Sequence, residues 1–175
     1  MKTTSLLSIL PAAILMAFAP VAAEAGIEVS IAVPGRISGD RVLEYSDPSP
    51  HFHVIVTNTS DGPKRIWREW CSWGYYALCF EVTDAKGKTW TVSKKVREWD
   101  KNFPDYWTVK PHECLVIDVE FADSGIWEGF PRPVGTSEAY RMRAVFEIQR
   151  DKHSQEHSVW TGRAVSKVDD YVFYR

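Results

Sequence analysis

The residues that offer the most chemistry in this chain are aromatic, and they are concentrated in two segments. Seven of the eight tryptophans lie between Trp67 and Trp127. An exposed group of aromatic rings can stack on sugar rings or anchor a protein partner, and a neighbouring arginine can add a cation–π contact. The candidate binding residues are Trp67, Trp70, Trp73 and Tyr75 in the first segment and Arg97, Trp99, Tyr106 and Trp107 in the second.

The spacing of Trp67, Trp70 and Trp73 would align these rings along one side of a helical turn. The second aromatic segment would then form the opposite wall of the site. In a strand the three rings would alternate between two sides, and the surface would be broken. Alternatively, the two segments pack on each other and cap one end of the domain, since tryptophan is usually mostly buried.

Residue types that support catalysis or metal binding are present, but they do not form a recognisable constellation. His51 and His53 share one side of a strand, yet a metal site needs several converging ligands. His153 and His157 have helical spacing in a polar stretch without a nearby cysteine. We therefore expect no metal and no other cofactor.

Four carboxylates lie in the aromatic segments, where paired acids beside rings would be typical of a glycosidase. Basic residues next to them favour ordinary ion pairs instead. The chain also lacks a Gly-x-Ser-x-Gly nucleophile turn and a glycine-rich phosphate loop. These patterns predict a protein that is not an enzyme. The carboxylates are Glu69, Glu98, Asp100 and Asp105, and the basic residues are Arg68, Arg97 and Lys101.

The three cysteines are Cys71, Cys79 and Cys114, and an odd number leaves at least one thiol without an internal partner. Their spacing matches no zinc motif. Gly74 lies between Cys71 and Cys79 and would let the chain bend back, so the expected disulfide is Cys71–Cys79 with Cys114 free. Alternatively, all three are reduced.

The N-terminal residues have the pattern of a cleavable signal peptide. Lys2 precedes an apolar run over residues 6–18, and Ala23-Glu24-Ala25 offers small residues at the positions that a signal peptidase reads. The run is short for a membrane span of about 20 residues and contains Pro11. We expect a leader over residues 1–25, a domain over residues 26–175, an extracytoplasmic location (periplasmic or secreted) and no membrane insertion after cleavage.

Charge and length restrict the partners and the size of the core. The net charge is −2, and charges of both signs are interspersed. This argues against a nucleic-acid partner. About 150 residues can bury a sizeable core without disulfides or metals.

Period-two alternation of apolar residues dominates the chain, which is typical of strands with one buried face. Frequent turn signals separate these stripes, as at residues 58–63 and 84–87. Short helical turns are expected near residues 99–103 and 151–157. Together these features predict an all-β, immunoglobulin-like sandwich with aromatic-rich loops. The residues expected to face inward are Phe52, Val54, Phe80, Val82, Leu115, Ile117, Phe121 and Phe146.

The stretch over residues 52–121 also resembles a known class of domain. The segments VIVTNTSDGP (54–63), FEVTDAKGKTW (80–90) and VKPHECL (109–115) are similar to small bacterial immunoglobulin-like domains, including the intracellular proteinase inhibitor family. The ending, with RAVFE (143–147) and VWTGR (159–163), resembles secreted bacterial proteins with this kind of domain. The resemblance implies a sandwich and, more distantly, protease inhibition, and no inhibitory motif can be matched.

The expected function is therefore a non-enzymatic extracytoplasmic binding or interaction module with a protein or glycan partner. A secreted protease inhibitor and a carbohydrate-binding or carbohydrate-active protein are the alternatives. Inhibition requires a protruding loop that enters a protease cleft, and sugar binding requires coplanar exposed rings.

Overall fold

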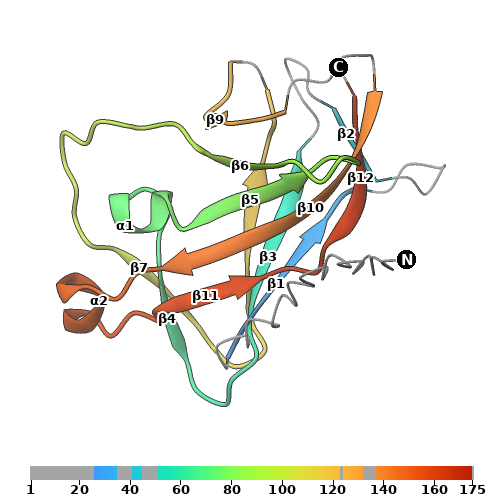
Figure 1. Ribbon diagram of the computed structural model, residues 1–175. Helices are drawn as coiled ribbons and strands as arrows, with labels where there is room; N and C mark the ends of the chain where they lie inside the picture. Colours follow the sequence, from blue (N-terminus) through green and yellow to red (C-terminus); the bar gives the residue numbers. More distant parts are fainter. Residues whose placement is uncertain (1–25, 35–40, 45–50, 123, 132–136, 175) are drawn as a thin grey trace, which may run out of the picture.

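Strands account for most of the fold, which we describe from a computed structural model covering residues 26–34, 41–44, 51–122, 124–131 and 137–174 (Figure 1). The strands are β1 (Ile27–Ala32), β2 (Val42–Glu44), β3 (Phe52–Asn58), β4 (Lys64–Trp67), β5 (Leu78–Thr83), β6 (Thr89–Lys94), β7 (Tyr106–Val109), β8 (Cys114–Val119), β9 (Trp127–Glu128), β10 (Ser137–Ile148), β11 (Gly162–Val165) and β12 (Asp169–Tyr174). The short helices are α1 (Ser72–Tyr75) and α2 (Lys152–Glu156).

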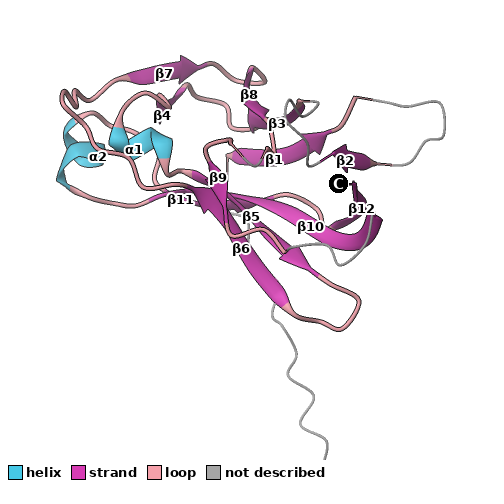
Figure 2. Cartoon of the chain, turned by 90° about the horizontal axis from the view of Figure 1, so that it is seen from above, coloured by secondary structure: helices cyan, strands magenta, loops and turns pink. Residues whose placement is uncertain are grey.

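Two sheets form the layers of a sandwich-like arrangement, which Figure 2 shows from above. The smaller sheet has the order β1-β3-β8, and the larger has the order β2-β12-β10-β5-β6-β9 with β11 also paired to β10. All pairs are antiparallel except β12 with β2. The all-β sandwich predicted from the alternation is therefore confirmed.

The core between the layers is built by the alternating residues of both sheets. On β3, Phe52 and Val54 are buried while His53 between them is half-buried. The ring of Phe52 meets Phe80 of β5 and Phe121 edge-on, with centroid distances of 5.7 and 4.9 Å. Such pairs add to the free energy gained from apolar burial. Of the residues expected inside, all are buried except Leu115, which is partly buried against the core.

Four strands were not expected from the sequence: β2, β4, β7 and β9. The helical turn expected over residues 151–157 is present as α2, whereas the one expected near residues 99–103 is absent. The helix α1 was also not expected. The predicted leader over residues 1–25 lies outside the described residues.

One end of the sandwich carries the helices and a separate two-stranded sheet. The strands β4 and β7 pair with each other, and Ile66 lies opposite Trp107. Figures 1 and 2 place α1 and α2 beside this pair, away from the C-terminal end of β12. This arrangement brings the two aromatic segments together at what we call the helical end.

No helix in the described part of the chain is both long and apolar enough to cross a membrane.

Candidate functional site

The candidate surface begins where β4 ends and the chain turns into α1. The amide of Arg68 donates to the carbonyl oxygen of Asp105 at 2.9 Å and so extends the pairing of β4 with the segment before β7. The carbonyl oxygen of Arg68 then accepts from the amide of Cys71 at 3.2 Å. A Cβ atom on Gly74 would lie 2.2 Å from the same carbonyl oxygen, so only glycine allows α1 to pack this closely on the turn.

This turn directs Trp70 outward, where it meets Trp107 of β7. The Trp70 side chain is 56% exposed and the Trp107 side chain 39% exposed. Their ring centroids are 6.0 Å apart at an interplanar angle of 61°. The guanidinium of Arg68 lies over both rings, 4.6 Å from the centroid of Trp70 and 3.6 Å from that of Trp107.

The carboxylate of Asp105 fixes this arrangement. Its Oδ2 accepts a hydrogen bond from Trp70 Nε1 at 2.8 Å, and its Oδ1 lies 3.4 Å from Arg68 Nε. The Oδ1 atom also accepts from the amide of Tyr106 at 2.9 Å, which orients the carboxylate. We call Arg68, Trp70, Asp105 and Trp107 the tryptophan–arginine patch. Its side chains are held in place by contacts within the protein, so little side-chain entropy remains to be lost on binding.

Other predicted site residues are buried or partly buried. Trp67 is 2% exposed, and its ring lies 5.7 Å from Trp73 and 6.3 Å from Tyr106. The rings of His157 and His153 complete this cluster against Trp67 and Trp73, respectively. These contacts join β4, β7, α1 and α2 into one unit. Trp67, Trp73 and Tyr106 therefore hold the helical end together.

The remaining predicted residues form a third group around Trp99. The Tyr75 ring is buried, and its centroid lies 5.5 Å from that of Trp99. The guanidinium of Arg97 lies 4.7 Å from the Trp99 centroid. Burial raises the pKa of the Tyr75 hydroxyl above its ordinary value. A shallow pocket of about 460 Å³ beside Tyr75 is lined by Lys95, Arg97 and the exposed Val96 and Ile126, among others.

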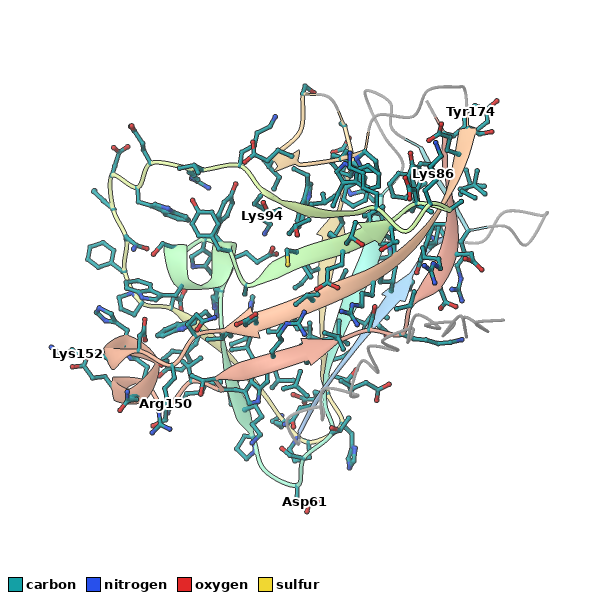
Figure 3. The ribbon with its side chains drawn as sticks, viewed as in Figure 1. Asp61, Lys86, Lys94, Arg150, Lys152 and Tyr174 are labelled. Carbon is teal, nitrogen blue, oxygen red and sulfur yellow. The ribbon has the colours of Figure 1, made fainter. Side chains whose placement is uncertain are left out.

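A buried lysine connects this third group to the core. The ammonium of Lys94 forms an ion pair with Glu69 at 2.5 Å and lies 4.8 Å from the Tyr75 centroid and 5.4 Å from that of Trp127. The Lys94 side chain, labelled in Figure 3, is 3% exposed. Burial removes water from the ammonium of Lys94. The carboxylate and the two ring faces compensate for that loss.

The predicted alignment of Trp67, Trp70 and Trp73 is wrong. Trp67 ends a strand, Trp70 lies in the following turn and Trp73 lies in α1, so the three share no helical turn. The predicted opposite wall is also divided, since Trp107 contacts Trp70, Tyr106 contacts Trp67, and Arg97 with Trp99 contacts Tyr75. Asp105 was considered only as a possible acid, and no local pattern indicates that it binds Trp70, 35 residues away.

The expected Cys71–Cys79 disulfide is absent, and all three cysteines of the chain, each within the described residues, are free thiols. The buried Cys71 Sγ donates to the carbonyl oxygen of Arg68 at 3.1 Å. Cys79 belongs to β5, where its neighbour Phe80 faces the core and Cys79 faces the other side. The bend at Gly74 therefore turns Cys71 toward the β4 turn and not toward Cys79.

Among the described residues, no group of three or more histidine, cysteine, aspartate and glutamate side chains is placed to hold a metal ion. His53 Nδ1 instead contacts Asp118 Oδ1 at 2.8 Å, and His51 Nε2 lies 3.7 Å from Glu120.

No protein-family model and no curated protein matches the chain.

Proposed function

We propose that this chain is a non-enzymatic extracytoplasmic binding module whose protein partner docks on the tryptophan–arginine patch. The observation that carries the proposal is the exposed pair of Trp70 and Trp107 with the Arg68 guanidinium over both rings. Tryptophan and arginine are the residue types that most often dominate binding energy in protein interfaces. The hydrogen bond from Trp70 to Asp105 supports a surface that is organised before the partner arrives.

The geometry of the rings favours a protein over a glycan as the partner. Stacking on a sugar uses one flat aromatic face or several coplanar faces, whereas Trp70 and Trp107 are inclined by 61°. The Arg68 guanidinium also covers part of both faces. A protein side chain or backbone segment can fit the angle between the rings.

The extracytoplasmic location rests on the N-terminal sequence, with Lys2, the apolar run over residues 6–18 and the Ala23-Glu24-Ala25 site. N-terminal sequencing of the exported protein should give a first residue near Gly26. An intact Met1 terminus in the cytoplasmic fraction would exclude export.

The binding proposal is tested with single variants and a matched control. Wild-type protein and the variants Trp70→Ala, Trp107→Ala and Tyr174→Ala are immobilised and exposed to an envelope and culture-medium extract of the producing cell. Tyr174 is an exposed aromatic residue that Figure 3 labels at the opposite end of the molecule from Lys152. Bound proteins are identified by mass spectrometry, and the affinity of each purified candidate is then measured.

We expect a partner that binds wild type and Tyr174→Ala but binds each tryptophan variant about thirtyfold more weakly, as for a residue that contributes about 2 kcal/mol. Equal recovery by all four proteins would contradict the proposal. A glycan array measured in parallel provides the other outcome. Sugar binding that is weakened in Trp70→Ala and Trp107→Ala would show that the partner is a glycan and not a protein.

A further inference from the structure

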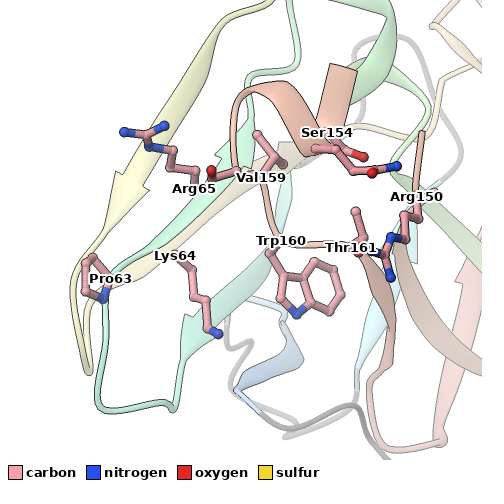
Figure 4. Close-up of a pocket in the computed structure, with 10 residues that line it drawn as sticks. Pro63, Lys64, Arg65, Arg150, Ser154, Val159, Trp160 and Thr161 are labelled. Atoms are coloured by element: carbon pink, nitrogen blue, oxygen red, sulfur yellow. The ribbon is translucent and has the colours of Figure 1, made fainter. Parts of the chain in front are cut away.

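A second region gathers positive charge in a pocket between β4, α2 and the segment that leads into β11 (Figure 4). The pocket has a volume of about 370 Å³, within the range of small-molecule sites. Its lining includes the cations Lys64, Arg65 and Arg150 and contains no aspartate or glutamate. We call this site the basic pocket.

Two of these cations have no ion-pair partner in the part of the chain that the structure describes. Neither Lys64 nor Arg150 has an ion-pair or hydrogen-bond partner for its side chain among the described residues. Arg65 differs, since its Nη1 donates to the carbonyl oxygen of His157 at 2.7 Å and its guanidinium lies 4.7 Å from the Tyr106 centroid. In Figure 4 the Arg65 guanidinium points away from Trp160, so the aliphatic part of the Arg65 side chain lines the pocket.

By contrast, two arginines of the larger sheet share one carboxylate. Arg143 and Arg163 both bind the carboxylate of Glu81, at 2.5 and 2.8 Å. The positive charge gathered at the basic pocket is not part of a general excess, since the whole chain carries a net charge of −2.

The rest of the lining supplies an apolar surface and neutral polar groups. Figure 4 draws Lys64 and Arg150 on opposite sides of the Trp160 indole. The side chains of Thr161 and Gln155 have no hydrogen-bond partner among the described residues and are free to bind a ligand. Ser154 is not free in this way, because its hydroxyl takes part in the cap of α2.

Hydrogen bonds between distant segments hold the walls of the pocket in place. The amide of Trp160 donates to the carbonyl oxygen of Arg65 at 2.9 Å, and Val159 forms a parallel bridge to Arg65. Asp151 caps α2 by accepting from the amide of Ser154 at 2.7 Å. Lys64 and Arg150 are thus presented by anchored backbone, which reduces the entropy lost when a ligand binds.

We propose that the basic pocket binds a small molecule carrying phosphate or sulfate groups. Oxyanion groups of the ligand contact Lys64 on one side of Trp160 and Arg150 on the other, since a guanidinium and an ammonium form strong charge-assisted hydrogen bonds with such oxygens. The adjoining part of the ligand contacts Trp160. This site uses no residue of the tryptophan–arginine patch and does not depend on the function proposed for it.

The test uses inorganic pyrophosphate as the probe, titrated into the full-length mature protein by calorimetry, with the Trp160 indole N–H followed by NMR. We expect one saturable site and a shift of the Trp160 signal. Lys64→Ala and Arg150→Ala should each weaken binding about tenfold or more, as for the loss of a charge-assisted hydrogen bond. Inorganic sulfate, titrated in the same way, distinguishes a sulfate site from one that prefers phosphate.

Arg141→Ala is the control, because Arg141 is an exposed arginine on β10 and does not line the basic pocket. It should bind pyrophosphate as wild type does. Thermal melting confirms that every variant is folded before its binding is interpreted. The proposal is overturned if neither pyrophosphate nor sulfate gives saturable binding, if Arg141→Ala weakens binding as much as Arg150→Ala, or if folded protein lacking both Lys64 and Arg150 side chains binds as wild type does.

Discussion

The side-chain amide of Asn58 donates a hydrogen bond to the carbonyl oxygen of Val109 at 2.9 Å, which ties the end of β3 to the end of β7. Asn58 is fully buried and also donates to the carbonyl oxygen of Gly62 at 2.8 Å. Its Oδ1 accepts from the amide of Ser60 at 3.0 Å. Because β7 carries Trp107 and pairs with β4, this one side chain helps set the position of the helical end on the sandwich.

Asn58→Ala should lower the free energy of unfolding by at least about 2 kcal/mol, because it leaves buried polar backbone groups without partners. Asn58→Asp should also destabilise, since a carboxylate would face two carbonyl oxygens. Urea denaturation measures both effects. Thr59→Ala is the control on the exposed side of the same turn and should change stability by less than about 0.5 kcal/mol. A similarly small loss for Asn58→Ala would show that the turn does not depend on this amide.

Phe80 and Phe146 lie in the core that the alternation predicted, on the paired strands β5 and β10. Truncating either side chain to alanine should cost about 3–5 kcal/mol, from lost burial and from the cavity left behind. Chemical denaturation of the two single variants checks this. A loss of unfolding free energy below about 1 kcal/mol at both positions would mean that other residues form the core.

Most of the strands that the sequence predicted are long enough to show a period of two. On β3 and β8, more and less buried residues alternate over six or seven positions, and Val54 of one stripe pairs with Ile117 of the other. The strands β2 and β9 have only three and two residues, too few to show a period. In β4, Ile66 and Trp67 are both buried, so its pattern does not alternate.

The functional surfaces were only partly predictable, because their contacts join residues far apart in the chain. The aromatic composition indicated the helical end, but it did not separate the exposed Trp70 from the buried Trp67. That separation depends on the turn over residues 68–71 and on the space that Gly74 leaves for the Arg68 backbone. The basic pocket has no local pattern in the sequence, since Lys64 and Arg150 line one pocket only after β4 and α2 are folded together.

Alkylation of the folded protein with iodoacetamide should modify Cys114 first. Cys114 is exposed, whereas Cys71 is buried and bound to the Arg68 carbonyl oxygen. Burial, with the nearby Glu81 carboxylate, raises the pKa of the Cys79 thiol, so less of the reactive thiolate is present at neutral pH. Peptide mapping after brief labelling gives the order. Faster labelling of Cys71 or Cys79, or a disulfide between any two of the three, would contradict this prediction.

The cap of α2 should contribute stability that depends on pH. The hydrogen bond from the Ser154 amide lowers the pKa of the Asp151 carboxyl below its ordinary value. As the pH falls, the unfolded chain therefore binds the proton before the folded chain does. The stabilisation is present above the unfolded pKa of about 3.9 and is lost as the pH falls through the folded pKa. Asp151→Ala should cost about 1 kcal/mol at pH 7. The difference from wild type in urea denaturation should shrink toward pH 3, and a difference that stays constant would exclude the carboxylate as its source.

Trp67 and Trp70 should respond very differently to the same substitution, although they are only three positions apart and both belong to the first aromatic segment. Trp67 is 2% exposed and contacts the rings of Trp73, Tyr106 and His157, so Trp67→Ala should cost about 3–5 kcal/mol. Trp70 is 56% exposed, and Trp70→Ala removes one hydrogen bond to Asp105 and one cation–π contact, which together contribute about 1 kcal/mol. Thermal and chemical denaturation of the two variants measures the contrast. A large loss of stability in both would mean that Trp70 serves the fold as Trp67 does, and the surface assigned to binding would then be a structural cap.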